Sequence, residues 1–433
     1  MDVHISEGRI SRLSAPQTEP TRWGRGDVDG RGHSLLPGLV DAHIHLDKAY
    51  LLALLEEDDL PEGHLLDGDA DCRQQRTLGG AGTAVTATAG ATEAIGAGGA
   101  AGAGGAAGAG GAAGAGGLQQ AMAAVQRLRE ERGLDIVRQG MDRLLTQMTR
   151  QGTVAARAHV EVGTGIDPVV VQVHREAAAR HPLVQLQLVA FPQLGTSHDP
   201  DAARWMNRAL DDGCTVVGGC PYADDDPELH LELVFALAAE RGLPVDLHLD
   251  LTDDPQAAQI DLVLAAAARA GLEGRVNLGH MTALSAMSPQ RLARVLAGLR
   301  DSGTSITAIP TTDLWLSGRT AQRPGVRGVA PVRALLEAGV RVALASNNHQ
   351  NPFTPVSGGG LLRAAWLASL VCHIGDRAGQ LQLLHAVTTS PAQILGLGRW
   401  EVGEDSSAPL LLAEVERAVD AVRVAPDVLR RLT

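Results

Sequence analysis

The chain has 433 residues, a mass of 45.0 kDa and a formal net charge of −13 at pH 7. Hydrophobic residues make up 45% of it and charged residues 20%, a balance typical of a globular protein with a sizeable core. The negative charge argues against nucleic acid and anionic membranes as partners, since both are polyanions. Because no apolar run approaches the ~20 residues of a membrane span and the polar start does not resemble a signal peptide, we expect a cytoplasmic protein without a membrane partner.

The opening of the chain predicts a short β-hairpin, formed by Val3–Ile5 and Gly8–Ser14 around Glu7 and Gly8. From residue 35 to about residue 375, short apolar runs alternate with helical periodicity, the pattern of βα units. The predicted strands are Leu39–Leu46, Val154–Val162, Leu186–Phe191, Cys214–Gly219, Val245–Leu251, Arg275–His280, Ser305–Ile309 and Val340–Ala345. Helical stretches between them include Ala202–Leu210, Leu229–Arg241, Ala257–Ala270, Pro289–Leu299, Pro331–Ala338 and Gly360–Val371.

Eight strands with intervening helices predict an α/β fold, a (β/α)8 TIM barrel over residues 35–395. The tail contains two strand-like stretches, Ala408–Ala413 and Ala418–Val424. We expect these stretches to pair with the N-terminal hairpin in a small β-sandwich beside the barrel. The sandwich would comprise residues 1–34 and 396–433.

A low-complexity tract of glycine and alanine at residues 78–117 interrupts this pattern. It lies between the first barrel strand and the helix predicted over Leu118–Arg132. Glycine is a poor helix former, and residues 96–117 are glycine and alanine alone, with no large side chain to bury, so the composition predicts a flexible loop. An active-site lid is the alternative, because this connection would emerge at the C-terminal face of the barrel.

The strongest chemical signal is the segment DAHIHLDK, which contains His43 and His45 at the end of the first predicted barrel strand. Alternate residues of a strand point the same way, so both imidazoles face the barrel mouth and can converge on one divalent cation. Polar residues end other strands as well, namely His248 with Asp246 and Asp250, then His280, and finally Asn347 with His349. Barrel enzymes build their sites at these strand ends, so the pattern favours a metal site.

The single lysine and the spacing of the cysteines limit the chemistry that the chain can perform. Lys48 is the only lysine of the chain, which excludes a Schiff base or a carbamylated lysine at any other position. It is either an anchor for an anionic substrate group or a partner in a structural ion pair. His159 and Glu161 alternate on the second strand, where we expect them to fill the polar interior of the barrel. The four cysteines show no CxxC spacing and do not indicate a zinc knuckle or a disulfide framework.

Five segments, in this order along the chain, resemble the amidohydrolase superfamily and, within it, the cytosine deaminase-like branch that includes the N-isopropylammelide amidohydrolases. They are LLPGLVDAHIHLDKAY, VAFPQLG, GLPVDLHLDLTDD, LGHMTALSAM and ALASNNHQNPFTP. The resemblance implies one zinc or iron ion held by His43, His45 and His248, and it places His280 at the metal-bound water or the reacting atom. It also implies that Gln193 reads the ring amide of a cytosine-like substrate and that Phe353 lines the pocket over the ring.

The sequence departs from this family pattern at two positions. Asn347 stands where the family has an aspartate that ligates the metal and takes a proton, and Leu251 stands where the deaminases have a glutamate. Asparagine cannot act as a base, although its carbonyl oxygen can still serve as a weak metal ligand. Asp250 and Asp313 are the nearest replacements as acid or base. The surrounding segments resemble a subgroup of the branch in which asparagine is the usual residue.

The leading hypothesis is a metal-dependent hydrolase of a cyclic amide or amidine carbon–nitrogen bond. A metal-bound hydroxide would attack an sp² ring carbon of a small nitrogen-containing substrate, and ammonia or an amine would leave. Leu251 and Asn347 motivate a second hypothesis, a catalytically degraded barrel that acts as a ligand-binding protein. A metal-dependent esterase or lactonase is the third. The sequence leaves open zinc versus iron and whether the protein forms a homo-oligomer.

Overall fold

The computed structural model describes residues 2–6, 9–14, 28–58, 115–197, 199–318, 328–356, 360–404, 406–427 and 429–432. Residues 78–114 of the glycine and alanine tract lie outside the described residues, so the loop and the lid both stay predictions. The helix predicted after the tract is confirmed as α2 (Ala115–Arg132). Among the described residues, no helix combines the length and the apolar character needed to span a bilayer.

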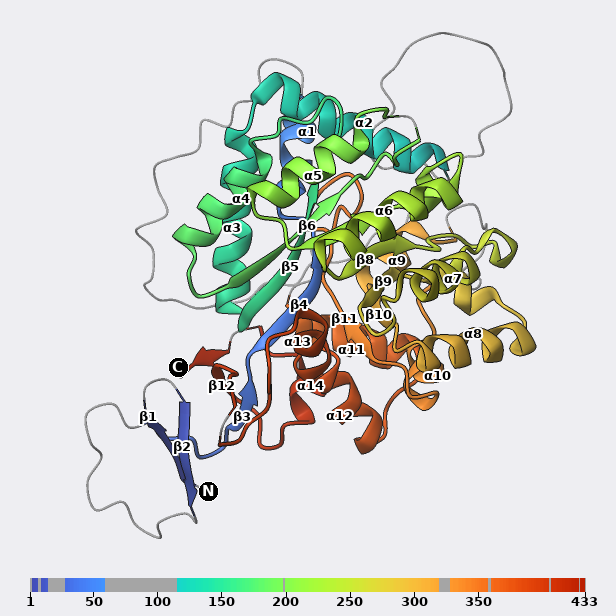
Figure 1. The fold of residues 1–433 in the computed structure, drawn as a ribbon. Helices are drawn as coiled ribbons and strands as arrows, with labels where there is room; N and C mark the ends of the chain where they lie inside the picture. Colours follow the sequence, from blue (N-terminus) through green and yellow to red (C-terminus); the bar gives the residue numbers. More distant parts are fainter. Residues whose placement is uncertain are drawn as a thin grey trace, which may run out of the picture.

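Eight parallel strands form one sheet at the centre of the molecule (Figure 1), in the order of the sequence. They are β4 (Leu39–Ile44), β5 (Thr153–Glu161), β6 (Gln185–Phe191), β7 (Val216–Gly219), β8 (Val245–Leu249), β9 (Val276–His280), β10 (Ser305–Ala308) and β11 (Val342–Leu344). A parallel bridge between Ile44 and Asn347 joins the first and last strands. This closure confirms the TIM barrel, and all eight predicted strands are present.

Helices surround this sheet (Figure 1), and the predicted helical stretches are confirmed. The helices that follow the barrel strands are α3 (Asp135–Arg150), α4 (Val170–Arg180), α5 (Ala202–Asp212), α6 (Pro227–Arg241), α7 (Ile260–Ala270), α8 (Pro289–Asp301), α9 (Pro310–Leu316), α10 (Val332–Glu337), α11 (Leu361–Val371), α12 (Arg377–His385) and α13 (Thr389–Leu395). Local signals fix their ends. In α6, Asp226 caps the start by accepting a hydrogen bond from the backbone of Leu229, and Gly242 ends the helix in a left-handed conformation.

The core lies between the strands and the helices. Strands β4, β5, β7, β8 and β9 are buried along their whole length, as expected for parallel strands covered on both faces. Their outward side chains are mostly Val, Leu and Ala, and they pack against apolar helix faces such as Met141, Leu144 and Leu145 of α3. The apolar core between strands and helices therefore stabilises the barrel. The barrel interior is left for the polar residues at the strand ends.

The small sheets near the termini differ in part from the expectation. The N-terminal hairpin is confirmed as β1 (Asp2–Ser6) and β2 (Arg9–Ser14), which form a sheet of their own. The C-terminal strand β12 (Leu410–Ala413) pairs with β3 (Ser34–Pro37) and β13 (Arg430–Arg431). The expected strand at Ala418–Val424 is wrong, because helix α14 (Asp420–Val424) occupies this stretch and buries Ala421 and Val422. Adjacent apolar residues in so short a run fit either structure.

Candidate active site

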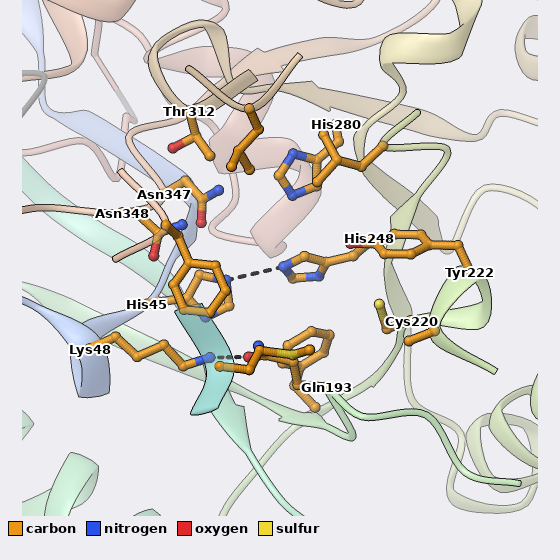
Figure 2. Close-up of a pocket in the computed structure, with 16 residues that line it drawn as sticks. His45, Lys48, Gln193, Cys220, Tyr222, His248, His280, Thr312, Asn347 and Asn348 are labelled. Carbon is orange, nitrogen blue, oxygen red and sulfur yellow. Dashed lines mark hydrogen bonds between the residues drawn. The ribbon is translucent and has the colours of Figure 1, made fainter. Parts of the chain in front are cut away.

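One pocket opens at the C-terminal ends of the barrel strands, where barrel enzymes place their sites. Its empty space, including the open mouth, is about 490 Å³. The lining residues come from connections after most of the strands and from helix α2: His45, Lys48, Met122, Phe191, Gln193, Cys220, Tyr222, Ala223, His248, Leu251, His280, Thr312, Leu316, Asn347, Asn348 and Phe353. The structure thus brings most of the predicted site residues to one place (Figure 2).

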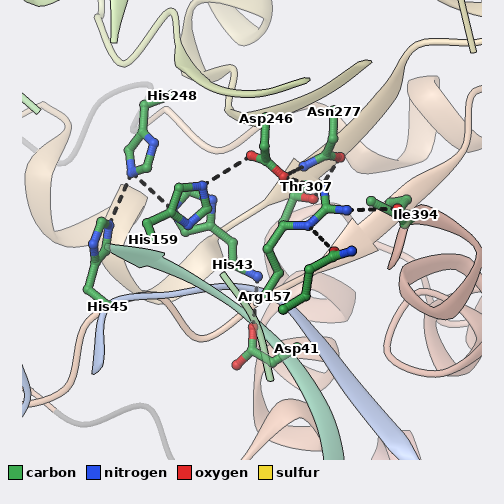
Figure 3. Close-up of polar contacts among 11 residues, drawn as sticks. Asp41, His43, His45, Arg157, His159, Asp246, His248, Asn277, Thr307 and Ile394 are labelled. Carbon is green, nitrogen blue, oxygen red and sulfur yellow. Dashed lines mark hydrogen bonds and ion pairs between the residues drawn. The ribbon is translucent and has the colours of Figure 1, made fainter. Parts of the chain in front are cut away.

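Three of the predicted metal ligands converge at the base of the pocket. Nε2 of His43 lies 3.0 Å from Nε2 of His248, and Nε2 of His45 lies 3.1 Å from the same atom (Figure 3). All three side chains are buried. A single imidazole nitrogen offers one hydrogen or one lone pair, so His248 Nε2 cannot make a good hydrogen bond to both neighbours at once. A cation that accepts all three lone pairs resolves this conflict.

The protonation state of these histidines fits a cation as well. Burial and the neighbouring histidines lower the pKa of His43 and of His248 well below its usual range, and burial and Lys48 do the same for the pKa of His45. Neutral imidazoles are the form that ligates a metal, and they bind zinc at about 2.0–2.1 Å. Asn347 follows β11 beside them, and its Oδ1 atom is buried without a hydrogen-bond partner among the described residues. The residues present therefore fit one divalent ion.

His159 joins this group from the neighbouring strand β5. Imidazole nitrogens of His43, His159 and His248 all lie within 4.8 Å of one another. However, Nε2 of His159 contacts Oδ1 of Asp246 at 3.2 Å, within a buried network that also contains Arg157 (Figure 3). This network fills the barrel interior beneath the three histidines, and it agrees with the interior role expected for His159.

A histidine–aspartate pair lies beside the metal-binding candidates. Nδ1 of His280, at the end of β9, is 2.6 Å from Oδ1 of Asp313 on α9, and both side chains are buried. Burial raises the pKa of Asp313, against the opposing effect of His280. His280 lines the pocket, whereas Asp313 lies behind it. Asp313 therefore affects the pocket through its hydrogen bond to the imidazole of His280.

Lys48 and Gln193 occupy the side of the pocket opposite His280 in Figure 2. The ammonium group of Lys48 donates to Oε1 of Gln193 and lies 3.4 Å from Oε2 of Glu161. Burial opposes ionisation of Glu161, but the charges of Lys48 and Arg129 outweigh it and lower the pKa of Glu161 to about 2. Lys48 thus forms an ion pair and also lines the pocket, so both interpretations from the sequence keep a structural basis.

The remaining predicted residues divide into two groups. Phe353 lines the pocket, and its ring centroid lies 5.2 Å from Nζ of Lys48. Leu251 also lines the pocket, at the position where the resemblance to the deaminases predicts a glutamate. Asp250 does not belong to the lining, because β8 ends at Leu249 and the next residue has a φ of 51°. Its Oδ1 atom accepts a hydrogen bond from the backbone of Gln259 instead.

Several pocket residues were not identified from the sequence. Cys220 and Tyr222 follow β7, Met122 comes from α2, and Thr312 and Asn348 follow β10 and β11. Burial and a contact with Cys220 raise the pKa of the Tyr222 hydroxyl well above its usual range, which keeps it protonated. For Cys220, Tyr222, Thr312 and Asn348, a place shortly after a predicted strand was the available signal, and it does not separate pocket residues from ordinary loop residues.

The TIM barrel and the buried histidines that meet at its strand ends define an enzyme-like barrel with a candidate metal site. The model of the amidohydrolase family matches residues 28–432, and the chain belongs to this family. A pterin deaminase of Rhizobium rhizogenes (strain K84 / ATCC BAA-868) is 30% identical over 288 residues, which is 64% of this chain and 64% of that protein. An N-isopropylammelide isopropyl amidohydrolase of Pseudomonas sp. (strain ADP) is 25% identical over 270 residues, 60% of this chain and 63% of that protein.

Both alignments span slightly less than two thirds of the relative's own length. Among solved structures, a 5-methylcytosine deaminase from Klebsiella pneumoniae liganded with phosphonocytosine superposes with a TM-score of 0.80 at 24% sequence identity. The superposition covers 99% of this chain and 92% of that chain, and it supports the fold. The resemblance to the cytosine deaminase-like branch is confirmed.

Proposed function

We propose that this protein is a metal-dependent hydrolase that cleaves a carbon–nitrogen bond of a small nitrogen heterocycle and releases ammonia or an amine. The observation that carries the proposal is the convergence of the Nε2 atoms of His43, His45 and His248 at the base of a pocket. The names of the similar proteins, a pterin deaminase and an N-isopropylammelide isopropyl amidohydrolase, support the class of substrate.

His43, His45 and His248 would hold one zinc or iron ion, with Oδ1 of Asn347 as a further candidate ligand. The ion would supply the Lewis acidity that makes water nucleophilic near neutral pH. Three imidazoles and an amide oxygen suit zinc and iron alike, so the metal is assigned only as a divalent cation.

We assign proton transfer to His280 with the support of Asp313. The 2.6 Å contact uses Nδ1 of His280, which leaves the other ring nitrogen for the pocket. An ionised Asp313 accepts the Nδ1 hydrogen, so the free nitrogen carries a lone pair that takes a proton from water and returns it to the leaving nitrogen. Asp250 is a weaker candidate, because its carboxylate holds the backbone of Gln259 outside the pocket lining.

We assign substrate binding to the side of the pocket that carries Lys48, Gln193 and Phe353. Lys48 can only donate hydrogen bonds, so its contact fixes Oε1 of Gln193 toward the ammonium group and leaves the amide hydrogens to face a substrate. Phe353 and Phe191 supply apolar ring surface along the same pocket. These groups suit a flat heterocycle that carries a carbonyl oxygen.

A second candidate function is ligand binding without turnover. Among the described residues that line the pocket there is no carboxylate, since Leu251 and Asn347 occupy the two positions where the family has one. A pocket without an acidic side chain can retain a heterocycle while lacking the means to protonate the leaving group.

Turnover of three probes separates these functions. The purified protein is incubated with pterin, 5-methylcytosine and N-isopropylammelide, and ammonia and isopropylamine are measured alongside binding by calorimetry. Product release that is lost in His280→Ala and retained in His181→Ala supports the hydrolase. Binding of a probe with no amine or ammonia from any of the three contradicts it and favours the ligand-binding protein. Acid formation from an ester or lactone probe alone would indicate the esterase.

A further inference from the structure

A second buried histidine–aspartate pair lies beside the pocket, next to the connections that follow β6 and β7. Nδ1 of His230, on α6, contacts Oδ2 of Asp224, and neither side chain is exposed. Nε2 of the same imidazole accepts a hydrogen bond of 3.1 Å from the backbone N–H of Cys220. Because Nε2 accepts, the ring hydrogen sits on Nδ1 and is donated to Asp224. The imidazole thus links the carboxylate to a residue that lines the pocket.

The carboxylate of Asp224 binds a different loop at the same time. It accepts hydrogen bonds of 2.7 Å from the backbone N–H groups of Thr196 and Ser197, and it also accepts from both of their hydroxyl groups. These residues follow Gln193 in the loop after β6. Burial opposes the charge, but the hydrogen bonds from His230, Ser197 and Thr196 outweigh it and lower the pKa of Asp224. The lowered pKa keeps the Asp224 carboxylate ionised at neutral pH.

Two glycines make room for this pair. Gly195 has a φ of +86°, and a Cβ atom there would lie 2.7 Å from the carboxylate carbon of Asp224. A Cβ atom on Gly219 would lie 2.5 Å from Nε2 of His230. Both distances are below any ordinary contact, so the backbone of each loop approaches the pair more closely than another residue type allows. Two independent positions of the sequence are thus adapted to Asp224 and His230.

The loops joined in this way follow the neighbouring strands β6 and β7 and carry adjacent parts of the pocket lining. One loop carries Gln193, and the other, the short 3-10 turn Pro221–Ala223 that follows Cys220, carries Tyr222. We propose that Asp224 and His230 are positioning residues that set the relative position of these two loops and so determine how tightly the heterocycle binds. This role rests on the proposed function. It lies apart from the metal-binding histidines, so its loss leaves the metal in place.

Hydrogen exchange tests the positioning directly, without turnover. In Asp224→Asn and His230→Ala, we expect the amides of Thr196, Ser197 and Cys220 to exchange about tenfold faster or more, while metal content stays at the wild-type value. His181→Ala is the matched control, because His181 contacts Asp142 at 2.9 Å and neither residue lines the pocket. Unchanged exchange of all three amides in both variants would overturn the proposal.

Binding and rescue distinguish positioning from a purely structural role. For a probe that is turned over, we expect KM to rise about tenfold in His230→Ala with a smaller change in kcat. For a probe that only binds, Kd should rise by the same factor. His230→Gln supplies one donor and one acceptor in a similar place and should recover most of the loss. Equal losses in His230→Gln and His230→Ala, together with equal drops in Tm, would contradict positioning.

If His230→Ala does not fold, Asp224→Asn carries the same exchange and KM measurements, since asparagine preserves the shape of the side chain. Failure of all three probes to react would overturn the proposed function while exchange and Kd still decide the positioning role. The two proposals therefore fail on different measurements.

Discussion

Nδ1 of His280 lies 2.6 Å from Oδ1 of Asp313, and the two buried side chains come from adjacent connections of the barrel. Asn347 and Leu251 line the same pocket as His280, at the two positions where the resemblance predicts carboxylates, and the lining residues that the structure describes include no acidic side chain. In the proposed reaction, the proton transfers therefore use other groups. His280 is the titratable side chain best placed for them, and Asp313 fixes its orientation.

Asp313→Asn tests this assignment. Asparagine has nearly the same shape but cannot hold a protonated His280 by charge, so we expect kcat to fall by about 10²–10⁴-fold at unchanged metal content. Asp301→Asn is the control, because Asp301 is exposed and pairs with the exposed Arg300 on the surface of α8. A kcat within twofold of wild type would remove His280 and Asp313 from the proton path.

Asn347→Asp tests the neutral residue at the metal site. The new carboxylate is a stronger ligand than an amide oxygen, so we expect the metal dissociation constant to fall by about 10–100-fold. The metal-free protein should lose about 3 kcal/mol of unfolding free energy, because a buried charge is left uncompensated. Competition with a chelator and denaturation of the metal-free form measure both effects.

Asn348→Asp is the matched control for that change. Asn348 also lines the pocket, but its Oδ1 atom accepts a hydrogen bond of 2.7 Å from Asn351. If the two variants tighten metal binding equally, Asn347 holds no special position at the metal.

The pH dependence of the unfolding free energy should reveal the stabilising effect of the Glu161 carboxylate. Its pKa is lowered to about 2 because the attraction of Lys48 and Arg129 outweighs the effect of burial. The unfolded chain titrates near the ordinary value of 4.5, so this stabilisation is complete above that pH and is lost as the pH falls toward 2. Glu161→Gln should lower the unfolding free energy by about 3 kcal/mol at neutral pH and by progressively less below pH ~4.5.

Denaturant titrations of wild type and Glu161→Gln at several pH values measure this difference. Parallel stability curves over the whole acid range would show that Glu161 gains nothing from its cationic neighbours. Because Lys48 contacts both Glu161 and the pocket, the same variant should also alter probe binding.

Arg129 joins helix α2 to the barrel by two ion pairs. Its guanidinium group contacts Oδ2 of Asp47 at 2.6 Å and Oε2 of Glu161 at 2.8 Å, and only 12% of its side chain is exposed. Arg129→Met leaves two buried carboxylates without this partner, so we expect a loss of about 3–5 kcal/mol in unfolding free energy. Arg127→Met, on the same helix, removes an exposed side chain 3.9 Å from Glu131 and should cost less than about 1 kcal/mol. Equal losses would contradict a specific anchor at Arg129.

The strands and the convergence of His43, His45 and His248 were predictable from the sequence because each has a local signal. Apolar runs bounded by loops located the barrel strands, and the alternation of a strand placed His43 and His45 on one face. The order of the segments then brought His248 and His280 to the same end of the barrel. A short run such as Ala418–Val424 lacked that support, because its adjacent apolar residues fit a strand or a helix, and it forms helix α14.

The rest of the site depends on contacts between distant parts of the chain. Arg129 meets Asp47 across 82 positions, and nothing in either local sequence indicates the pairing. Asp250 fitted the strand alternation, yet β8 ends one residue earlier and the backbone turns its carboxylate away. Cys220 and Tyr222 reach the pocket because Asp224 and His230 hold their loop, which is a tertiary effect.

Metal content tests the central claim most directly. Elemental analysis of protein purified without added metal or chelator should give about one zinc or iron per chain. The value should fall close to zero in His43→Ala and His248→Ala and stay unchanged in His181→Ala. Near-zero metal in the wild type that persists after reconstitution, or full metal retention in His248→Ala, would contradict a metal site formed by the three histidines.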